Sequence, residues 1–440
     1  MGSKTLTIAQ VSATEYGGGA ESIARQLHEC YRRRGHDATL LVGRGAATGD
    51  GVIAFGEGRH AGLDHLLAGP LRILDRQRGL ESYHYPRSRT VLSQLARPVD
   101  IVHLHNLHGG YFDLRMLPTL SRTQPVVMTL HDAWLLSGHC AHSFDCERWR
   151  TGCGACPDLT IYPAVLRDAT AVNWQRKREI FAHSKLYVAT PSQWLADRVR
   201  DSMMAPALAD LRVIPNGVDL DTFSPGDRTV ARAAVGLADD ESVLLAIGSA
   251  ALDNPFKDFA TVRAAAARAA GLAGRELTLV VVGATAGEER HNGLRLRTVP
   301  FVQDTTTMAQ WYRAADLYVH AARADTFPTA VLEALACGTP VVATAVGGIP
   351  EQVRAVPHDH ATGALTPAGN AAGMAAAIAA LVGDRALRAR LGARAARTAR
   401  ERFGAERQCS DYLDWYRSIG SAGGDSVGSA DEEFFGSADG

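Results

Sequence analysis

Features that place a chain in a membrane or in a repeat array are missing from this sequence. No apolar run approaches the ~20 residues that a membrane-spanning helix needs. The first residues, Met-Gly-Ser-Lys-Thr-Leu-Thr-Ile, lack the apolar core of a signal peptide, and no repeat of solenoid length is present. We therefore expect a cytoplasmic protein, and a peripheral position at the inner membrane face stays open.

Lysine is scarce. Only four of the 46 basic residues are lysines: Lys4, Lys177, Lys185 and Lys257. Against this arginine-rich background, a lysine just before an apparent helix, as Lys257 is, indicates a need for a compact ammonium group. An ammonium suits a phosphate. The alternative is an ordinary lysine in solvent.

Cysteines are few and unevenly placed. Three of the seven, Cys30, Cys337 and Cys409, fall in apparent helices, where we expect them to be small core residues. An odd count in a chain without a signal peptide favours a reducing compartment. The other four form a separate cluster.

The clustered cysteines are Cys140, Cys146, Cys153 and Cys156, in an insert that spans residues 139–157. Such a set favours thiolate coordination of a structural zinc ion. Cys153 and Cys156 have the usual metal spacing, the first two are more widely spaced, and His139 and His142 are substitute ligands. Free buried thiols and disulfides are the alternatives. Because four protein ligands would close the site, we expect no catalytic metal and no cofactor for catalysis.

Length and composition fit a soluble globular protein. With 440 residues, 46% apolar and 21% charged, two domains of roughly 200 residues each are expected. The net charge of −1 is unevenly spread, because residues 1–215 hold 25 basic and 20 acidic residues and the remainder 21 and 27. One explanation of the uneven charge is ordinary solubility. The other is that a face of the N-terminal half approaches an anionic substrate or membrane. We expect no nucleic-acid partner.

One segment of the first half, residues 44–97, combines arginines with an apolar patch. The arginines are Arg72, Arg76, Arg78, Arg87 and Arg89, and the patch is Leu63, Leu66, Leu67, Leu71, Ile73 and Leu74. A basic amphipathic helix can lie on a membrane or hold an anionic acceptor. The alternative is a solvated helix packed on its own domain.

The first half opens with an apolar strand at 6–11, a glycine run at 17–19, an amphipathic helix at 20–34 and a strand at 38–42. This order is typical of a doubly wound sheet. The turn lacks the spaced glycines of a dinucleotide site, but its glycines, Gly18 and Gly19 among them, would let a phosphate approach the backbone. A tight turn without a ligand is the alternative.

Further strands are expected at 101–104, 126–130, 186–189 and 213–214, each followed by polar residues. Ligands of open α/β sheets bind beyond the carboxyl ends of the strands. His131 and Asp132 follow one such strand, and a histidine there can bond a sugar hydroxyl or an oxyanion. A structural histidine on a backbone carbonyl is the alternative.

A Pro-bounded linker at 211–225 separates a second α/β series. Its strands are expected at 243–247, 277–282, 317–320 and 341–343, with a helix at 259–270 and covering helices at 370–402. This alternation predicts a second parallel-sheet domain. An aromatic helix at 403–419 follows, and the Gly-, Ser- and acid-rich residues 420–440 favour disorder.

The stretch 323–344 carries the sharpest functional signal. It predicts a helix at Thr329–Ala336, ended by Gly338, with Asp325 before the helix and Glu333 inside it. A helix start is an anion site, and flanking carboxylates would repel an anion unless they bind hydroxyls of the same ligand. An anion with hydroxyls on both sides is a nucleotide-sugar.

Three motifs together resemble the retaining glycosyltransferases of family 4, which have two facing Rossmann-like domains (the GT-B fold). The motifs are Gly17-Gly18-Gly19-Ala-Glu21, Ile214-Pro-Asn-Gly-Val-Asp219, and Asp325 to Glu333 with the Ala-Cys-Gly-Thr-Pro-Val-Val segment after it. The resemblance covers residues 5–418, and the cysteine-rich insert looks like that of a subgroup found in polysaccharide and natural-product clusters. The resemblance implies an acceptor domain (1–215), a donor domain (216–403), a helix crossing back to the first domain (404–419) and a disordered acidic tail (420–440).

The resemblance also implies roles for residues. Glu333 would hold the ribose hydroxyls and Asp325, a glutamate in the family, would lie near the donor sugar. The backbone at 299–302 would meet the base. A second cation that the family often has is missing from 248–257. The expected catalytic residues are His131, Lys257, Asp325 and Glu333; the expected donor contacts are Gly18, Gly19, Lys257, Val302, Asp325, Thr326, Phe327, Pro328, Thr329, Leu332 and Glu333.

The expected activity is transfer of a sugar from a UDP-, GDP- or dTDP-sugar to a small-molecule, glycan or lipid-linked acceptor, with retention of configuration. The leaving diphosphate would be stabilised by Lys257, by the Gly18 and Gly19 amides and by the helix start, because no DxD-type metal loop is present. A nucleotide-sugar epimerase or hydrolase on the same fold, and a non-catalytic sugar-binding scaffold, are the alternatives.

Overall fold

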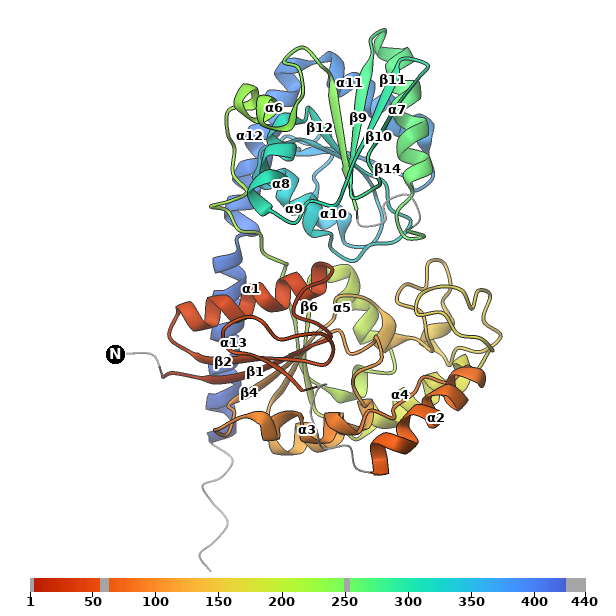
Figure 1. Cartoon of the computed structure of the whole chain (residues 1–440), viewed down its shortest axis with the longest axis vertical. Coiled ribbons are helices and arrows are strands. Elements are labelled where there is room, and N and C mark those ends of the chain that lie inside the picture. The colour runs from red at the N-terminus through yellow and green to blue at the C-terminus, as the bar shows by residue number, and fades with distance from the viewer. Residues whose placement is uncertain (1–3, 56–62, 249–253, 425–440) are drawn as a thin grey trace, which may run out of the picture.

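The computed structural model describes residues 4–55, 63–248 and 254–424. Two α/β domains lie one above the other, and the last long helix runs along the N-terminal domain (Figure 1). Each domain is a sheet between layers of helices. The predicted fold class, two doubly wound α/β domains, is therefore confirmed.

The N-terminal domain is built on a seven-stranded parallel sheet with the strand order β3-β2-β1-β4-β5-β6-β7. Its strands are β1 (Thr7–Ser12), β2 (Asp37–Val42), β3 (Val52–Ala54), β4 (Ile101–His105), β5 (Val126–Thr129), β6 (Leu186–Thr190) and β7 (Leu208–Val213). Its helices are α1 (Gly19–Arg33), α2 (Leu63–Gln77), α3 (Leu117–Thr123), α4 (Thr170–Ala182) and α5 (Gln193–Arg200). The order reverses between β1 and β4, the point where open sheets bind ligands.

The C-terminal domain holds a second seven-stranded sheet with the order β10-β11-β9-β8-β12-β13-β14. Its strands are β8 (Val243–Ile247), β9 (Leu277–Val282), β10 (Gly287–His291), β11 (Leu294–Val299), β12 (Leu317–His320), β13 (Val341–Thr344) and β14 (Gly363–Thr366). Its helices are α6 (Arg228–Val235), α7 (Phe259–Ala273), α8 (Thr305–Ala314), α9 (Thr329–Ala336), α10 (Ile349–Gln352), α11 (Ala371–Gly383) and α12 (Arg385–Arg402). The predicted helix at 329–336 is confirmed as α9.

The expectation of a wholly parallel second sheet is wrong at one edge. Strand β10 is antiparallel to β11 and all its residues are exposed. The turn between them is Asn292-Gly293, and both residues have positive φ, which is the pairing that two-residue hairpins favour. By contrast, the central strand β9 is buried throughout, as parallel strands covered on both faces are.

The chain crosses between the domains twice, and the two crossings run side by side. The backbone N–H of Val218 donates to the carbonyl of Phe403 (2.7 Å), and that of Ala405 donates back to Val218 (2.9 Å). A Cβ on Gly217 would lie 2.6 Å from the Cα of Ala405, so only glycine fits there. The predicted Pro-Asn-Gly turn thus forms half of a two-stranded junction.

The second crossing leads into α13 (Ala405–Gly424), which packs on the N-terminal domain. Tyr412, Trp415 and Tyr416 are at most 1% exposed. The helix continues past residue 419, into the segment for which disorder was predicted. Residues 425–440, the rest of that predicted acidic tail, lie outside the described part of the chain. Among the described residues, no helix is long and apolar enough to cross a bilayer.

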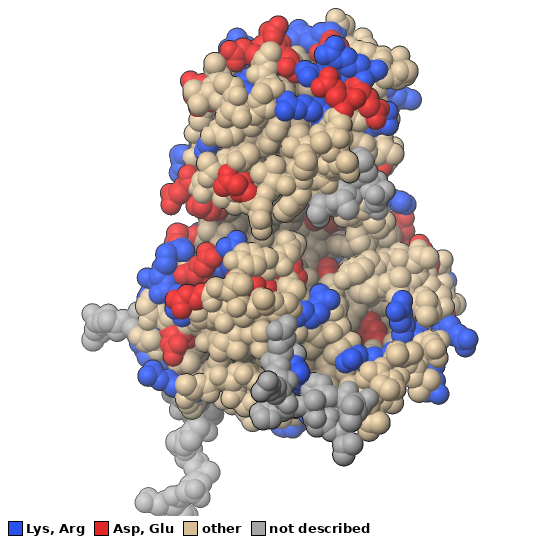
Figure 2. All heavy atoms as spheres, in the orientation of Figure 1, with Lys and Arg blue, Asp and Glu red and all other residues tan. Residues whose placement is uncertain are grey.

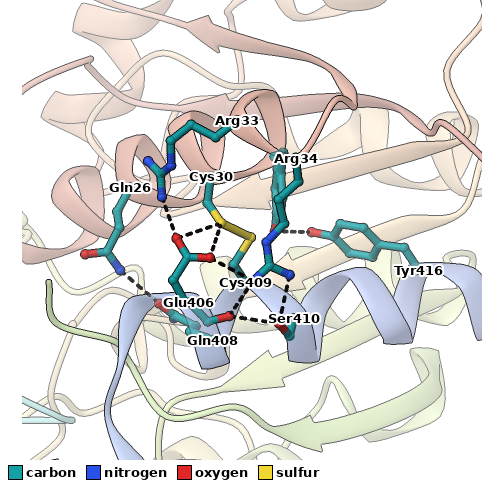
Figure 3. Close-up of a disulfide and its surroundings, with 10 residues drawn as sticks. Gln26, Cys30, Arg33, Arg34, Glu406, Gln408, Cys409, Ser410 and Tyr416 are labelled. Carbon is teal, nitrogen blue, oxygen red and sulfur yellow. Dashed lines mark hydrogen bonds and ion pairs between the residues drawn. A yellow bond between two sulfur atoms is a disulfide. The ribbon is translucent and has the colours of Figure 1, made fainter. Parts of the chain in front are cut away.

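A disulfide joins α13 to α1, between Cys409 and Cys30 (Figure 3). Both residues are buried, but the expectation that they are separate core thiols is wrong. The sequence could not pair them because 379 residues separate them. Cys337 is a buried free thiol, as expected. Beside the disulfide, Glu406 bridges Arg33 and Arg34 at 2.6 and 2.7 Å.

Replacing both linked cysteines, Cys30→Ser with Cys409→Ser, is expected to lower the free energy of unfolding by about 2–4 kcal/mol, because the link restricts the unfolded chain. Thermal unfolding followed by circular dichroism measures the change. Reductant should lower the melting temperature of the wild type and leave that of the double variant unchanged. An equal response of the two proteins to reductant would contradict the prediction.

Candidate active site

A cavity of about 790 Å³ lies between the two domains, and residues of both line it. Figure 2 shows the surface hollowed between the domains. Ten of the residues expected at the site line this cavity: Gly18, Gly19, His131, Lys257, Val302, Asp325, Phe327, Pro328, Thr329 and Glu333. Thr326 and Leu332 do not line it; both are buried behind its wall.

Two helix starts face each other across the cavity. A Cβ on Gly19, the first residue of α1, would lie 3.9 Å from the hydroxyl oxygen of Thr329, the first residue of α9. Each start presents unpaired backbone N–H groups and the positive end of a helix dipole. One of these amides is already engaged, since the N–H of Gly18 donates to the Glu21 carboxylate at 3.0 Å. The two starts come close together at this point, and the adjoining part of the cavity, which both of them line, suits an anion.

Lys257 and Asp325 form an ion pair at 2.6 Å, so two predicted site residues bind each other. Burial alone would raise the pKa of Asp325, but the Lys257 ammonium and His320 lower that pKa well below its ordinary value. Burial lowers the pKa of His320 to about 4. Near neutral pH, Asp325 is therefore ionised, His320 is neutral, and a bound phosphate would share Lys257 with Asp325.

Glu333 lies deeper in the same wall. The Tyr312 hydroxyl donates to one carboxylate oxygen of Glu333 at 2.7 Å, and burial raises the pKa of Glu333. The other oxygen accepts no hydrogen bond from a described residue and is free for a ligand hydroxyl. In the loop before α9, the Thr326 hydroxyl is buried and has no partner among the described residues. Gly347 and Gly348 let the backbone pack directly on this loop, at the carbonyls of Asp325 and Thr326.

His131 and Asp132 stand on the opposite wall. Burial lowers the pKa of His131 to about 4, so its imidazole is neutral near pH 7. Asp132 is not free for a ligand: it accepts from His108 at 2.7 Å and from the backbone N–H of Trp134 at 2.9 Å. Burial would raise the pKa of Asp132, but His108 and these hydrogen bonds lower it to about 2.

Several lining residues were not expected from the sequence. Among them are Asn106, Tyr162, Asn216 and Phe256. Asn216 belongs to the Ile-Pro-Asn-Gly motif, and its side-chain amide donates to the carbonyl of Phe327 (3.3 Å), which ties the domain junction to the loop before α9. The motif was therefore a usable signal, as was the position of Asn106 directly after β4, whereas Tyr162 and Phe256 lie in loops without a pattern.

Two contacts hold the domains together beside the cavity. The Glu351 carboxylate accepts the backbone N–H groups of Gln193 and Trp194 at 2.8 and 2.9 Å, and so caps the start of α5 from the other domain. The cysteine-rich insert also reaches across, because the ring of Phe256 lies 5.1 Å from His142 and 5.9 Å from Phe144. The insert is thus part of the interdomain contact.

The insert's four cysteines are free of disulfides. Nε2 of His139 lies 3.4 Å from the sulfur of Cys156, and the backbone N–H of Gly138 donates to Cys153. Within residues 4–55, 63–248 and 254–424, no three His, Cys, Asp or Glu side chains are arranged to hold a metal ion. Burial raises the pKa of Cys153 to about 12. Structural zinc therefore stays a prediction.

Comparisons with known proteins agree with this architecture. A family model described as "Glycosyltransferase Family 4" matches residues 17–222, and one described as "Glycosyl transferases group 1" matches residues 241–384. D-inositol 3-phosphate glycosyltransferase of Nocardia farcinica is 31% identical over 352 residues, which is 75% of this chain and 70% of that protein. The enzyme of the same name from Geodermatophilus obscurus is 42% identical over 191 residues, but that match spans only 40% of this chain and 41% of the relative.

Solved structures share the fold at low identity. Sucrose-phosphate synthase from Thermosynechococcus elongatus aligns with a TM-score of 0.67 and 21% identity, over 95% of this chain and 100% of that one. HepE from Anabaena, in complex with UDP-glucose, aligns with a TM-score of 0.61 and 19% identity, over 93% and 100%. The family models, the Nocardia relative and the GT-B architecture agree: the chain belongs to the group 1, family 4 glycosyltransferases.

Proposed function

We propose that the protein transfers a sugar from a nucleoside-diphosphate sugar to an acceptor hydroxyl, with retention of anomeric configuration. One observation carries the proposal: the starts of α1 and α9 face each other across a cavity whose C-terminal wall holds Asp325 and Glu333. A ligand that satisfies both helix starts and both carboxylates has an anionic centre with hydroxyl groups on either side. That HepE binds UDP-glucose on the same fold supports this assignment.

The donor's diphosphate would lie in the cavity against the two helix starts and Lys257. The open oxygen of Glu333 would accept the ribose hydroxyls, and Asp325 would face the sugar, while the segment that includes Val302 would meet the base. The pairing of Lys257 with Asp325 keeps that carboxylate from repelling the diphosphate. One preorganised donor aimed at developing charge is typically worth roughly 3 kcal/mol of transition-state stabilisation.

The carboxylates of the cavity favour retention without a covalent intermediate. Each of the four that line the described part has a partner: Glu21 on the Gly18 amide, Asp132 on His108, Asp325 on Lys257 and Glu333 on Tyr312. Each of these partners occupies at least one carboxylate oxygen, and the free oxygen of Glu333 is the one assigned above to the ribose hydroxyls. The acceptor oxygen would then attack the anomeric carbon on the face that the diphosphate leaves, and its proton would pass to the departing phosphate oxygen.

Loss of the Lys257 ammonium is expected to lower kcat/KM about 100-fold, since roughly 3 kcal/mol of charge stabilisation is removed. Lys257→Ala is assayed for transfer from UDP-, GDP- and dTDP-sugars, after a thermal-shift panel has identified the donor. Lys185→Ala, an exposed lysine outside the cavity, is the matched control. Full turnover by Lys257→Ala would refute the diphosphate assignment, and no shift with any nucleotide-sugar would count against the transferase itself.

We also propose that the insert binds one structural zinc ion through Cys140, Cys146, Cys153 and Cys156, because the donor set has the soft thiolate chemistry that zinc prefers; since no three of the described side chains are arranged as a metal site, binding would have to draw these sulfurs together. Elemental analysis is expected to find about one zinc per chain. Cys153→Ser with Cys156→Ser should lose the metal, whereas Cys30→Ser with Cys409→Ser should keep it. A metal-free protein whose four insert thiols all react with a thiol reagent would contradict zinc binding.

Helix α2 offers a surface for an anionic membrane, which would suit a lipid-linked acceptor. Four large apolar side chains on it are exposed: Leu67 (59%), Leu71 (38%), Ile73 (60%) and Leu74 (38%). Arg72 and Arg76 are exposed on the same helix, and residues 1–215 carry the excess of positive charge. At 100° per residue Leu67, Leu71 and Leu74 share one face of α2, while Arg72 and Arg76 lie on the other side, so the leucine face would enter the bilayer and the arginines would add only longer-range attraction to anionic lipid.

Cosedimentation with vesicles tests this surface. The wild type is expected to bind vesicles that contain phosphatidylglycerol and to bind pure phosphatidylcholine several-fold more weakly, because the arginines add electrostatic attraction. Leu67→Gln with Leu74→Gln should weaken binding by about tenfold, since two apolar side chains on the same face no longer enter the interface. Leu166→Gln with Leu272→Gln removes leucines elsewhere that are at least as exposed and should have no effect. Equal binding by both double variants would contradict the assignment.

A further inference from the structure

A chain of hydrogen bonds leads from the interior of the first sheet to His131 at the cavity. Gln10, in β1, and His105, the last residue of β4, are both 0% exposed. The side-chain nitrogen Nε2 of Gln10 lies 3.3 Å from Nε2 of His105, and Nδ1 of His105 lies 3.1 Å from Nε2 of His131. The three side chains form one continuous path, which we call the Gln10–His105–His131 relay.

The orientation of the Gln10 amide sets the direction of this relay. Its nitrogen also lies 3.1 Å from the backbone carbonyl of Ala24, in α1. A carbonyl can only accept, so the amide must place its NH2 group, and not its oxygen, toward Ala24. The second N–H of the same group then donates to Nε2 of His105. Nε2 of His105 is therefore an acceptor and carries no proton.

The proton of His105 must consequently sit on Nδ1. A neutral imidazole has one donor and one acceptor nitrogen, and burial lowers the pKa of His105 well below its ordinary value. Nδ1–H of His105 thus donates to Nε2 of His131. Because His131 is neutral too, its own proton is confined to Nδ1. Among the described residues, Nδ1 of His131 has no hydrogen-bond partner, so it is available to a substrate.

We infer that Gln10 and His105 are positioning residues that hold His131 in the Nδ1-protonated form, so that His131 offers the substrate an N–H and not a lone pair. The inference rests on the proposed transferase function and refines it. His131 donates to a substrate oxygen, either a sugar hydroxyl or an oxygen that gains charge as the diphosphate leaves. It does not act as a general base, which agrees with passing the acceptor's proton to the departing phosphate.

His103 provides a neighbouring control. Its ring centre lies 4.0 Å from that of His105, and it is equally buried. Its two nitrogens bond the hydroxyls of Thr129 and Tyr416, each at 2.7 Å, so neither nitrogen is left to bond His105 or His131. A change at His103 therefore disturbs the same core without entering the relay.

Nitrogen-15 NMR of histidine-labelled protein reads the tautomer directly. In the free wild type, His131, assigned by the loss of its signals in His131→Asn, is expected to be protonated on Nδ1. In His105→Leu it should move toward the Nε2-protonated form that imidazole prefers in water, and in His103→Gln it should not. An Nε2-protonated His131 in the wild type would overturn the inference. Since this measurement needs no substrate, it decides the relay even if the transferase assay fails.

Kinetics test the consequence for turnover. His105→Leu is expected to lower kcat roughly 10- to 100-fold, with KM for the donor within about threefold, because the lost contact misorients one donor to the reacting groups. His105→Asn keeps an amide N–H near the Nδ1 position and should restore most of kcat. Equal loss in His105→Asn, His105→Leu and His103→Gln, at similar melting temperatures, would show a merely structural role and overturn the inference.

Discussion

Two helix starts that face each other across the cavity are the constraint on which the rest of the structure depends. The positive ends of α1 and α9 repel when no anion lies between them. The fold holds them in place with contacts made elsewhere: the paired crossings at Val218 and Gly404, Asn216 on the loop before α9, and Glu351 on the start of α5. A bound diphosphate would relieve this repulsion. Binding of the donor and closure of the two domains would therefore favour the same arrangement of α1 and α9.

Two of the four carboxylates that line the cavity are paired with a basic side chain before any ligand binds. Lys257 is paired with Asp325, and Asp132 with His108, while the buried histidines stay neutral. Oriented dipoles, namely the helix starts and the N–H of His131, therefore contribute to the field that a ligand meets. Such a preorganised environment stabilises developing charge without reorganising when the bond breaks.

Much of the architecture followed from local patterns. The strand–turn–helix order predicted both sheets, and Thr329–Ala336 is a helix with the predicted bounds because its apolar spacing and Gly338 both act within a few residues. The β10–β11 hairpin was missed although Asn292-Gly293 signals it, since its polar strand lacks the apolar alternation that marks a buried strand. The pairing of Cys30 with Cys409 had no local signal at all.

For the site, the sequence by itself determined which residue types stand at the strand and helix ends: the glycine run, His131, Lys257, Asp325 and Glu333. Spacing along the chain carries that information because loops at the carboxyl ends of parallel strands share one edge. Only the tertiary structure decided which of these side chains are free. Lys257 is paired with Asp325, Gly18 is bonded to Glu21, and Thr326 is buried. The proton of His131 is placed by Gln10 and His105. The choice of partners depends on distances between segments that are far apart in sequence.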